Sequence, residues 1–176
     1  MRTKNLADLY DLPLVDWSLI TDRLDGGLTV APGTGGPQHH SYWLATTNSD
    51  GSPHVTGVGS QWIDGAFWFV SGEHTRKSRN VARDPRCSLS LGTAEFDLVI
   101  EGEAHKVTDP ATVAKVAAEY AKDWPCTVDE SGVALTAPFS APSAGPAPWF
   151  IYRITITSAN ALRLTEPGGA TRWDFD

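Results

Sequence analysis

The alternation of apolar and polar residues between positions 42 and 71 predicts three consecutive antiparallel strands. The strands are expected at Tyr42–Thr47, Val55–Ile63 and Ala66–Ser71. The first connection, Asn48–Pro53, consists of turn-forming residues, and the second, Asp64-Gly65, is a two-residue hairpin signal. Because both connections are short, the three strands are expected to form a meander.

Two later regions of the chain also have the residue pattern of strands. The first comprises Cys87–Leu91 and Phe96–Val107, and the second comprises Trp149–Thr157 and Ala159–Leu164. Between these regions, residues 123–148 are rich in Pro, Ala and Ser and have little periodicity. This composition indicates a long ordered loop or a segment at the rim of the fold.

Three short helices are expected beside the strands, and each follows a capping residue. Asp16 caps the first helix, which ends at Gly26-Gly27, and Thr75 caps the second, Arg76–Arg83. Asp109 caps the third helix, whose first residue is a proline. The apolar side of this third helix is expected to pack on the strands and consists of Val113, Val116, Ala117 and Tyr120.

These elements predict a mainly β fold, with a closed antiparallel barrel and short helices at its ends. No strand–helix–strand series recurs, which argues against a doubly wound parallel sheet. We expect one domain over residues 1–176. An N-terminal helix and loop occupy 1–39, strands and the second helix occupy 40–107, and the last helix, the long loop, closing strands and tail occupy 108–176. Residues 1–15 are expected to be loosely ordered.

Composition narrows the class of protein. A chain of 176 residues with 41% hydrophobic residues suits one globular domain. No run of about 18 apolar residues exists, so no membrane partner is expected. Residues Met1–Asp16 lack the apolar stretch of a signal peptide, which favours a cytoplasmic location. The net charge of −7 disfavours a nucleic-acid partner. The two cysteines, Cys87 and Cys126, are expected to be reduced thiols.

Positive charge is concentrated in one short stretch. Of the 14 Lys and Arg residues, five lie between positions 76 and 86, where only Asp84 opposes them. They are Arg76, Lys77, Arg79, Arg83 and Arg86. An acidic chain that gathers its positive charge in this way is expected to bind an anion there.

The run Ser71–Asn80 combines this charge with a helix N-terminus. Free N–H groups and the helix dipole favour phosphate at such a position. Arg76 and Lys77 add full charges, and Thr75 adds a hydroxyl group. Helical spacing places Lys77 over Val81, so Lys77 is expected to lean toward the barrel and its ligand. The alternative is a solvated basic helix face that binds nothing.

Two glycines interrupt the second predicted strand. Gly57 and Gly59 share one face of it. Glycine weakens a strand unless another group approaches the backbone closely, as a planar ring would. The edge of such a ring would take hydrogen bonds from main-chain groups near Val58 to Ser60. A bulge or a bend of the barrel explains the glycines equally well.

The remaining candidate residues give weaker evidence for a functional site. Trp149 and Trp173 stand in polar or proline-rich surroundings, where they would cover a flat ligand or a partner subunit. The glycine-rich loop Pro32–Pro37 lacks the spacing of a phosphate loop. His39-His40 lack a third ligand, so no metal site is expected, and Cys126 has no activating partner. No catalytic residue is assigned. An anion site without acid–base groups suits hydride transfer, in which a cofactor carries the chemistry.

An ordered set of motifs in the chain resembles the pyridoxamine 5′-phosphate oxidase-like split-barrel superfamily. Within it, the chain is most similar to the flavin- and deazaflavin-dependent oxidoreductases. The motifs are Tyr42–Thr46, Asp50–Val55, Asp64-Gly65, Thr75–Asn80 and Asp84–Arg86. The resemblance implies a split antiparallel barrel that forms a homodimer and binds its cofactor at the subunit interface.

The resemblance also implies roles for individual residues. The segment on the phosphate side of the cofactor corresponds to Ser71, Arg76, Lys77 and Asn80. The strand beside the flavin ring corresponds to Val58, Gly59 and Ser60, and Trp173 in the tail would reach the cofactor of the partner subunit.

The expected function is hydride transfer between FMN or F420 and a small conjugated organic substrate. The charges of Arg79 and Arg83 would suit the longer anionic tail of F420, which we favour slightly over FMN. Three alternatives remain open. They are a cofactor- or pigment-binding protein without turnover, an FMN oxidase of the pyridoxamine 5′-phosphate oxidase type, and a basic helix that docks on a protein or a membrane without any cofactor.

Overall fold

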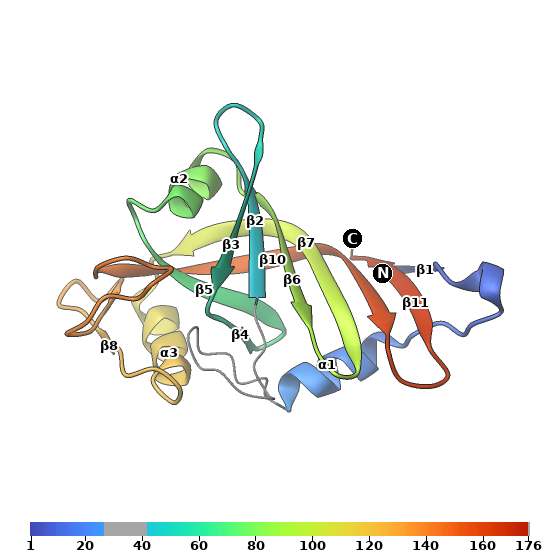
Figure 1. Ribbon diagram of the computed structural model, residues 1–176. Coiled ribbons are helices and arrows are strands. Elements are labelled where there is room, and N and C mark those ends of the chain that lie inside the picture. Colours follow the sequence, from blue (N-terminus) through green and yellow to red (C-terminus); the bar gives the residue numbers. More distant parts are fainter. Residues whose placement is uncertain (27–41, 176) are drawn as a thin grey trace.

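Gly59 is the single residue that joins the first and last strands of the barrel. In the computed structural model, which describes residues 1–26 and 42–175, the antiparallel strands follow the order β3-β2-β6-β7-β10-β5-β4 (Figure 1). The first and last strands of this series are consecutive in the chain, so the series closes into a barrel. Their bounds are β2 Tyr42–Thr47, β3 Pro53–Val58, β4 Ser60–Ile63, β5 Ala66–Gly72, β6 Arg86–Gly92, β7 Phe96–Val107 and β10 Trp149–Arg163. The expected mainly β fold, a split antiparallel barrel with a few short helices, is confirmed.

The long strand β10 is the place where the barrel splits. One edge of β10 pairs with β7 along most of its length, while the other edge pairs first with β5 and then with β11 (Gly169–Asp174). The change occurs where the register shifts between Ile156 and Ser158. Beyond it, β11 also pairs with β1 (Arg2–Asn5).

Two predicted strand divisions are therefore wrong. Val55–Ile63 is not one strand, because β3 pairs with β2 whereas β4 pairs with β5, and the chain changes partner at Gly59. Conversely, the expected break before Ala159 is only a bulge within β10, since β7 pairs on both sides of it. The strand β1 also corrects the expectation that residues 1–15 are loosely ordered.

The three predicted helices are confirmed, together with their caps. They are α1 (Trp17–Asp25), α2 (Arg76–Arg83) and α3 (Pro110–Tyr120). In each, a side-chain oxygen of the residue before the helix accepts a hydrogen bond from a main-chain N–H in the first turn. A short 3-10 helix, Asp8–Tyr10, and the small strands β8 (Thr127–Val128) and β9 (Leu135–Thr136) complete the described elements.

The buried apolar residues form two clusters that both include side chains of β10. One fills the barrel and contains Phe67, Leu89 and Ile154. The other lies under α3 and contains Trp149 and Ile151 of β10. The predicted apolar side of α3 belongs to this second cluster, with all four of its residues buried.

Two tryptophans predicted to cover a ligand lie in these clusters instead. Trp149 is fully buried, and its indole N–H donates to the Gly145 carbonyl at 2.8 Å. Trp173 is 1% exposed and packs against Trp17, with ring centroids 5.0 Å apart. Because Trp173 is enclosed within its own chain, its predicted contact with a partner's cofactor is withdrawn.

The remaining sequence expectations concern a glycine-rich loop, a histidine pair, metal binding and membrane spans. Pro32–Pro37 and His39-His40 lie outside the described residues. Within residues 1–26 and 42–175, no group of three or more His, Cys, Asp or Glu side chains is arranged to bind a metal ion. No helix in that same part has the length and apolar character needed to cross a membrane.

Candidate functional site

The N-terminus of α2 is fixed by a chain of hydroxyl groups. Thr75 caps the helix and accepts from the Ser78 N–H, while its own hydroxyl lies 2.7 Å from that of Ser71 and 3.0 Å from that of Ser78. Ser71 and Ser78 are buried, whereas Thr75 is half-buried. Ser71 therefore positions the helix start from behind, and Thr75 is the hydroxyl group that lies at the surface.

Lys77 is the unusual residue of this helix. Its side chain is only 3% exposed, as the predicted inward direction requires, and its ammonium group donates to the main-chain carbonyl of Ser143. Among the described residues, no carboxylate forms an ion pair with it. Burial lowers the pKa of Lys77 to about 8. A buried cation without a counter-charge is costly, and an anion next to it would offset that cost.

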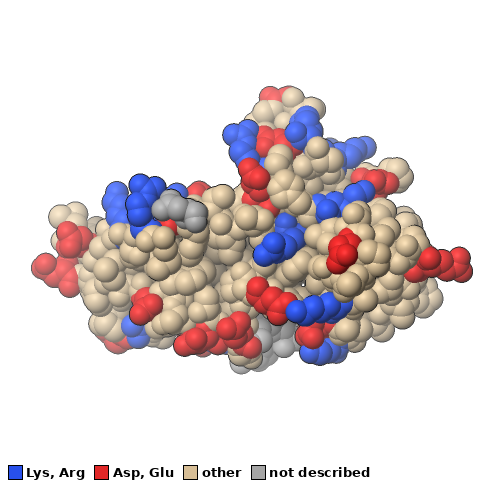
Figure 2. All heavy atoms as spheres, turned by 180° about the vertical axis from the view of Figure 1, so that it is seen from behind, with Lys and Arg blue, Asp and Glu red and all other residues tan. Residues whose placement is uncertain are grey.

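The remaining predicted residues of α2 divide into exposed and enclosed side chains. Arg76 and Arg79 are exposed, and Figure 2 shows basic side chains, with some acidic ones among them, around the projecting part of the molecule. Asn80 is buried, and its amide donates to Thr46 Oγ1 at 3.0 Å and to Asn48 Oδ1 at 3.1 Å. Asn80 thus joins α2 to the hairpin through its amide nitrogen.

The three residues predicted to lie beside a ring occupy the junction between β3 and β4. The side chains of Val58 and Ser60 are buried, and the Ser60 hydroxyl donates to the Trp68 carbonyl at 2.7 Å. Gly59 is half-buried, and its carbonyl accepts from the Tyr120 hydroxyl at 3.4 Å. The main chain, and not the side chains of Val58 and Ser60, is therefore what this junction presents to a ligand.

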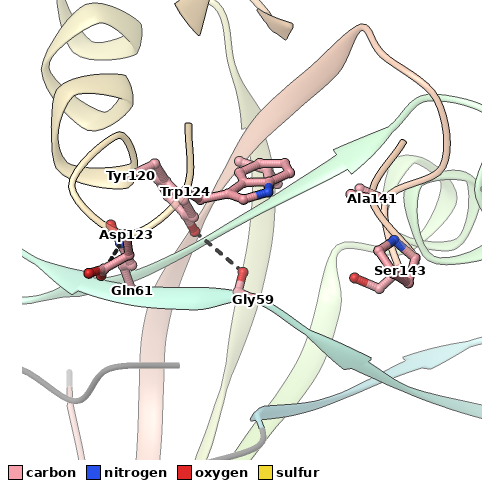
Figure 3. Close-up of a pocket in the computed structure, with 10 residues that line it drawn as sticks. Gly59, Gln61, Tyr120, Asp123, Trp124, Ala141 and Ser143 are labelled. Atoms are coloured by element: carbon pink, nitrogen blue, oxygen red, sulfur yellow. Dashed lines mark hydrogen bonds between the residues drawn. The ribbon is translucent and has the colours of Figure 1, made fainter. Parts of the chain in front are cut away.

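A cavity of about 70 Å³ lies between this junction, the end of α3 and the segment 141–144 (Figure 3). That volume admits roughly five water molecules or one small ring. The cavity is lined by Gly59, Gln61, Val70, Tyr120, Asp123, Trp124, Ala141, Pro142, Ser143 and Ala144. Since the Ser143 carbonyl accepts from Lys77, the cavity adjoins the buried cation of α2.

The segment 141–145 is held firmly against the start of α2. The Gly72 N–H donates to the Ala144 carbonyl at 2.9 Å, and a Cβ on Gly72 would lie only 2.6 Å from that oxygen. Gly145 has φ +76, in the left-handed region that favours glycine. A Cβ atom at this position would point toward Thr75. Gly72 is thus required by a close approach between two backbones.

The structure brings some predicted residues together and separates others. Thr75, Arg76, Lys77 and Gly59 lie around the α2 N-terminus and the adjoining cavity, whereas Ser71 and Asn80 support the helix from within. The sequence reasoning missed the cavity residues Gln61, Asp123, Trp124 and Ser143. Only Gln61, a polar residue on the same face of the predicted strand as Gly57 and Gly59, carried a signal that would have found it.

Comparisons with known proteins agree with this fold. Residues 36–160 match the profile of the family described as pyridoxamine 5′-phosphate oxidase. No curated protein shows significant sequence similarity to the chain. A conserved hypothetical protein from Mycobacterium tuberculosis is 19% identical, with a TM-score of 0.57 and 84% of each chain covered.

Two further solved structures are similar. A pyridoxamine 5′-phosphate oxidase-related, FMN-binding protein from Nostoc punctiforme is 13% identical, with a TM-score of 0.55 and coverage of 77% of this chain and 81% of that one. A heme-binding protein from Mycobacterium smegmatis is 17% identical, with a TM-score of 0.52 and coverage of 74% and 52% respectively. At such identities these similarities show the fold alone.

Proposed function

The chain belongs to the pyridoxamine 5′-phosphate oxidase family, and we propose that it binds FMN or the deazaflavin F420 and transfers a hydride to or from a small conjugated substrate. One observation carries the proposal. Lys77 is a buried cation at a helix N-terminus, and within the described residues its ammonium group contacts a carbonyl and no carboxylate.

The donor groups at the start of α2 suit a phosphate. Thr75 supplies a hydroxyl, Arg76 an exposed guanidinium and Lys77 an ammonium group, next to the free N–H groups of the first helical turn. A phosphate oxygen would replace the Ser143 carbonyl as the acceptor for Lys77. The exchange is favourable because a phosphate oxygen carries a negative charge that the carbonyl lacks, and opposite charges attract more strongly where water is excluded.

The ring of the cofactor would lie against the main chain at Gly59, next to the cavity. A bound flavin or deazaflavin supplies or accepts two electrons as a hydride, and the substrate double bond takes or releases one proton with it. The protein's own part is to orient the ring, to exclude water and to receive the substrate in the cavity. The main chain of residues 58–60 orients the ring, because the side chains of Val58 and Ser60 are buried.

The identity of the cofactor is proposed from charge. Arg79 is exposed one turn beyond the phosphate position, and Arg83 follows after another turn. These two charges extend the basic surface beyond what a single phosphate needs, which supports F420 with its longer anionic tail. FMN has the support of the family and of the FMN-binding relative from Nostoc punctiforme.

We also propose that the chain forms a homodimer. Trp43 is 51% exposed and Val55 is 57% exposed, on the same face of the β2–β3 pair. Large apolar side chains that lie side by side on an outer sheet face are typical of a covered surface. The partner is a second copy because the family resemblance implies a cofactor shared between subunits.

A fluorescence titration of the apoprotein with FMN and with F420 tests the proposal. We expect one of them to bind, and Lys77→Ala to weaken that binding about tenfold to a hundredfold, as the loss of one charged contact implies. Lys115→Ala is the matched control, because Lys115 is an exposed lysine of α3 that pairs with Asp64. If neither cofactor binds the parent protein, the proposal is wrong. Binding without turnover of any conjugated enone would indicate a carrier instead of an enzyme.

A further inference from the structure

We propose that the cavity beside Gly59 takes a flat, neutral or cationic substrate ring that carries an N–H donor, and that it rejects phosphorylated and other anionic substrates. Gln61 would recognise the N–H group, and Asp123 would disfavour the anions. This inference rests on the proposed function, because it assumes a cofactor bound at the Lys77 end of the same site.

Gln61, a residue that lines the cavity, has a buried hydrogen-bond acceptor without a partner in the described structure. Its Nε2 donates to Asp123 Oδ2 at 3.3 Å, while its Oε1 is buried and has no partner in the described structure. The carboxylate fixes this orientation of the amide, since Asp123 can only accept. Buried polar atoms without partners are rare in native proteins. The group that would satisfy Gln61 Oε1 is a donor, such as a ring N–H.

Two other polar groups of the cavity wall, the Tyr120 hydroxyl and the Ser143 carbonyl, already have hydrogen-bond partners. The Tyr120 hydroxyl donates to the Trp68 carbonyl at 2.8 Å and approaches the Gly59 carbonyl at 3.4 Å. Ser143 presents its carbonyl to Lys77. Among these three groups, Gln61 Oε1 is the acceptor that lacks a partner.

The charge of the cavity changes from one end to the other. Lys77 lies behind Ser143 at one end, and Asp123 stands at the opposite end beside Gln61 (Figure 3). Gln61 and Asp123 also line a second depression, which adds Asp25, Glu119 and Lys122. Three carboxylates there face one ammonium group, and that ammonium pairs with Glu119. An anion is thus attracted to the cofactor end and repelled from the substrate end.

Trp124 gives the cavity a flat aromatic wall. Its ring packs against Trp149 with centroids 4.7 Å apart and against Phe139 at 5.9 Å, which restrains its orientation. In Figure 3 the indole lies across the cavity between Tyr120 and the segment that carries Ser143. An aromatic face favours a stacked ring and attracts cations. Together with the orphan acceptor of Gln61, it specifies a planar N–H-bearing ring.

Three related probes separate the parts of this proposal. Uracil is flat, neutral and conjugated with N–H donors, 1,3-dimethyluracil lacks the donors, and orotate adds a carboxylate. Binding is measured by saturation-transfer NMR on the cofactor-loaded protein, with cofactor fluorescence recorded on the same sample. We expect uracil to bind at least about tenfold more tightly than either analogue, the ratio expected from one hydrogen bond or one charge repulsion.

Two variants assign the effects to residues. Gln61→Leu should abolish the preference for uracil over 1,3-dimethyluracil. Asp123 is exposed, and Asp123→Asn should raise the affinity for orotate several-fold. Equal or tighter binding of orotate by the parent protein would overturn the inference, as would the absence of binding by all three probes at millimolar concentration. If the cofactor itself fails to bind, the proposed function fails. If the cofactor binds and the selectivity is absent, only this inference fails.

Discussion

The ammonium group of Lys77 donates to the main-chain carbonyl of Ser143, a residue that follows it by 66 positions. This hydrogen bond joins the basic helix α2 to the wall of the cavity. It also places a positive charge where water is excluded, since Lys77 is almost fully buried. The first two predictions follow from that position.

Lys77→Met should stabilise the apoprotein at pH 7 by about 1–3 kcal/mol, because the apolar side chain removes a buried charge. Between pH 8 and 10.5 the folded lysine is neutral while the unfolded one is still protonated. The parent protein therefore gains stability over this interval, and the advantage of the variant should disappear. Urea unfolding of both proteins at pH 7 and at pH 10.5 measures the difference. A variant less stable than the parent at pH 7 contradicts the prediction.

Cofactor affinity should fall as the pH rises above about 8. Below that value Lys77 carries its proton in the free protein and attracts the phosphate, whereas above it binding must first restore the proton. The dissociation constant should then increase by up to about tenfold per pH unit. Fluorescence titrations between pH 6.5 and 9.5 test this. Lys77→Arg is the control, because arginine stays protonated and should give a flat profile.

Asn80→Ala should lower the free energy of unfolding by about 1–3 kcal/mol, because it leaves Thr46 Oγ1 and Asn48 Oδ1 without their donor. Arg79→Ala, on the exposed side of the same helix, should change it by less than about 0.5 kcal/mol. Chemical denaturation of the two variants provides the comparison. Equal effects would show that Asn80 does not anchor the helix to the hairpin.

Arg79→Ala should distinguish the two cofactors. If F420 is the natural cofactor, loss of this exposed charge should weaken its binding roughly three- to tenfold, whereas FMN affinity should hardly change. Arg83→Ala should act in the same direction, although Arg83 also donates to the Thr47 carbonyl and so supports the hairpin. Identical losses for FMN and F420 would indicate that Arg79 does not reach beyond the phosphate.

The proposed dimer should depend on the exposed face of β2 and β3. Trp43→Glu combined with Val55→Glu introduces two charges on that face and should convert a dimer into a folded monomer. Sedimentation velocity at micromolar concentration measures the state, and circular dichroism confirms the fold. A parent protein that sediments as a monomer would refute the dimer.

The starts of the three helices were predictable because their capping signals are local. Thr75 and Asp109 cap α2 and α3 through short-range hydrogen bonds, and sequence spacing alone identifies such caps. Strand division was not predictable in the same way. The alternation from Val55 to Ile63 continues across Gly59, and only the pairing with two different neighbours shows that the chain changes partner there.

Of the candidate site, only the basic start of α2 was predictable from the sequence, and the cavity was not. Lys77 was found because basic residues cluster at a predicted helix start, and its inward direction followed from helical spacing. The cavity half depends on contacts between distant segments, such as that of Gln61 with Asp123, which are 62 residues apart. Trp173 was misplaced for a related reason, since polar sequence neighbours do not reveal that Trp17 covers its ring.

The central place of β10 also sets the order in which this molecule can assemble on the ribosome. Strands β5 and β7 emerge early, but the neighbour that both pair with is made only after residue 148. At about 5–20 residues per second, their facing edges stay open for several seconds of translation. Long-range pairings of this kind form slowly, and open strand edges invite aggregation in the meantime. The nascent barrel therefore depends on rapid synthesis of the segment that contains β10.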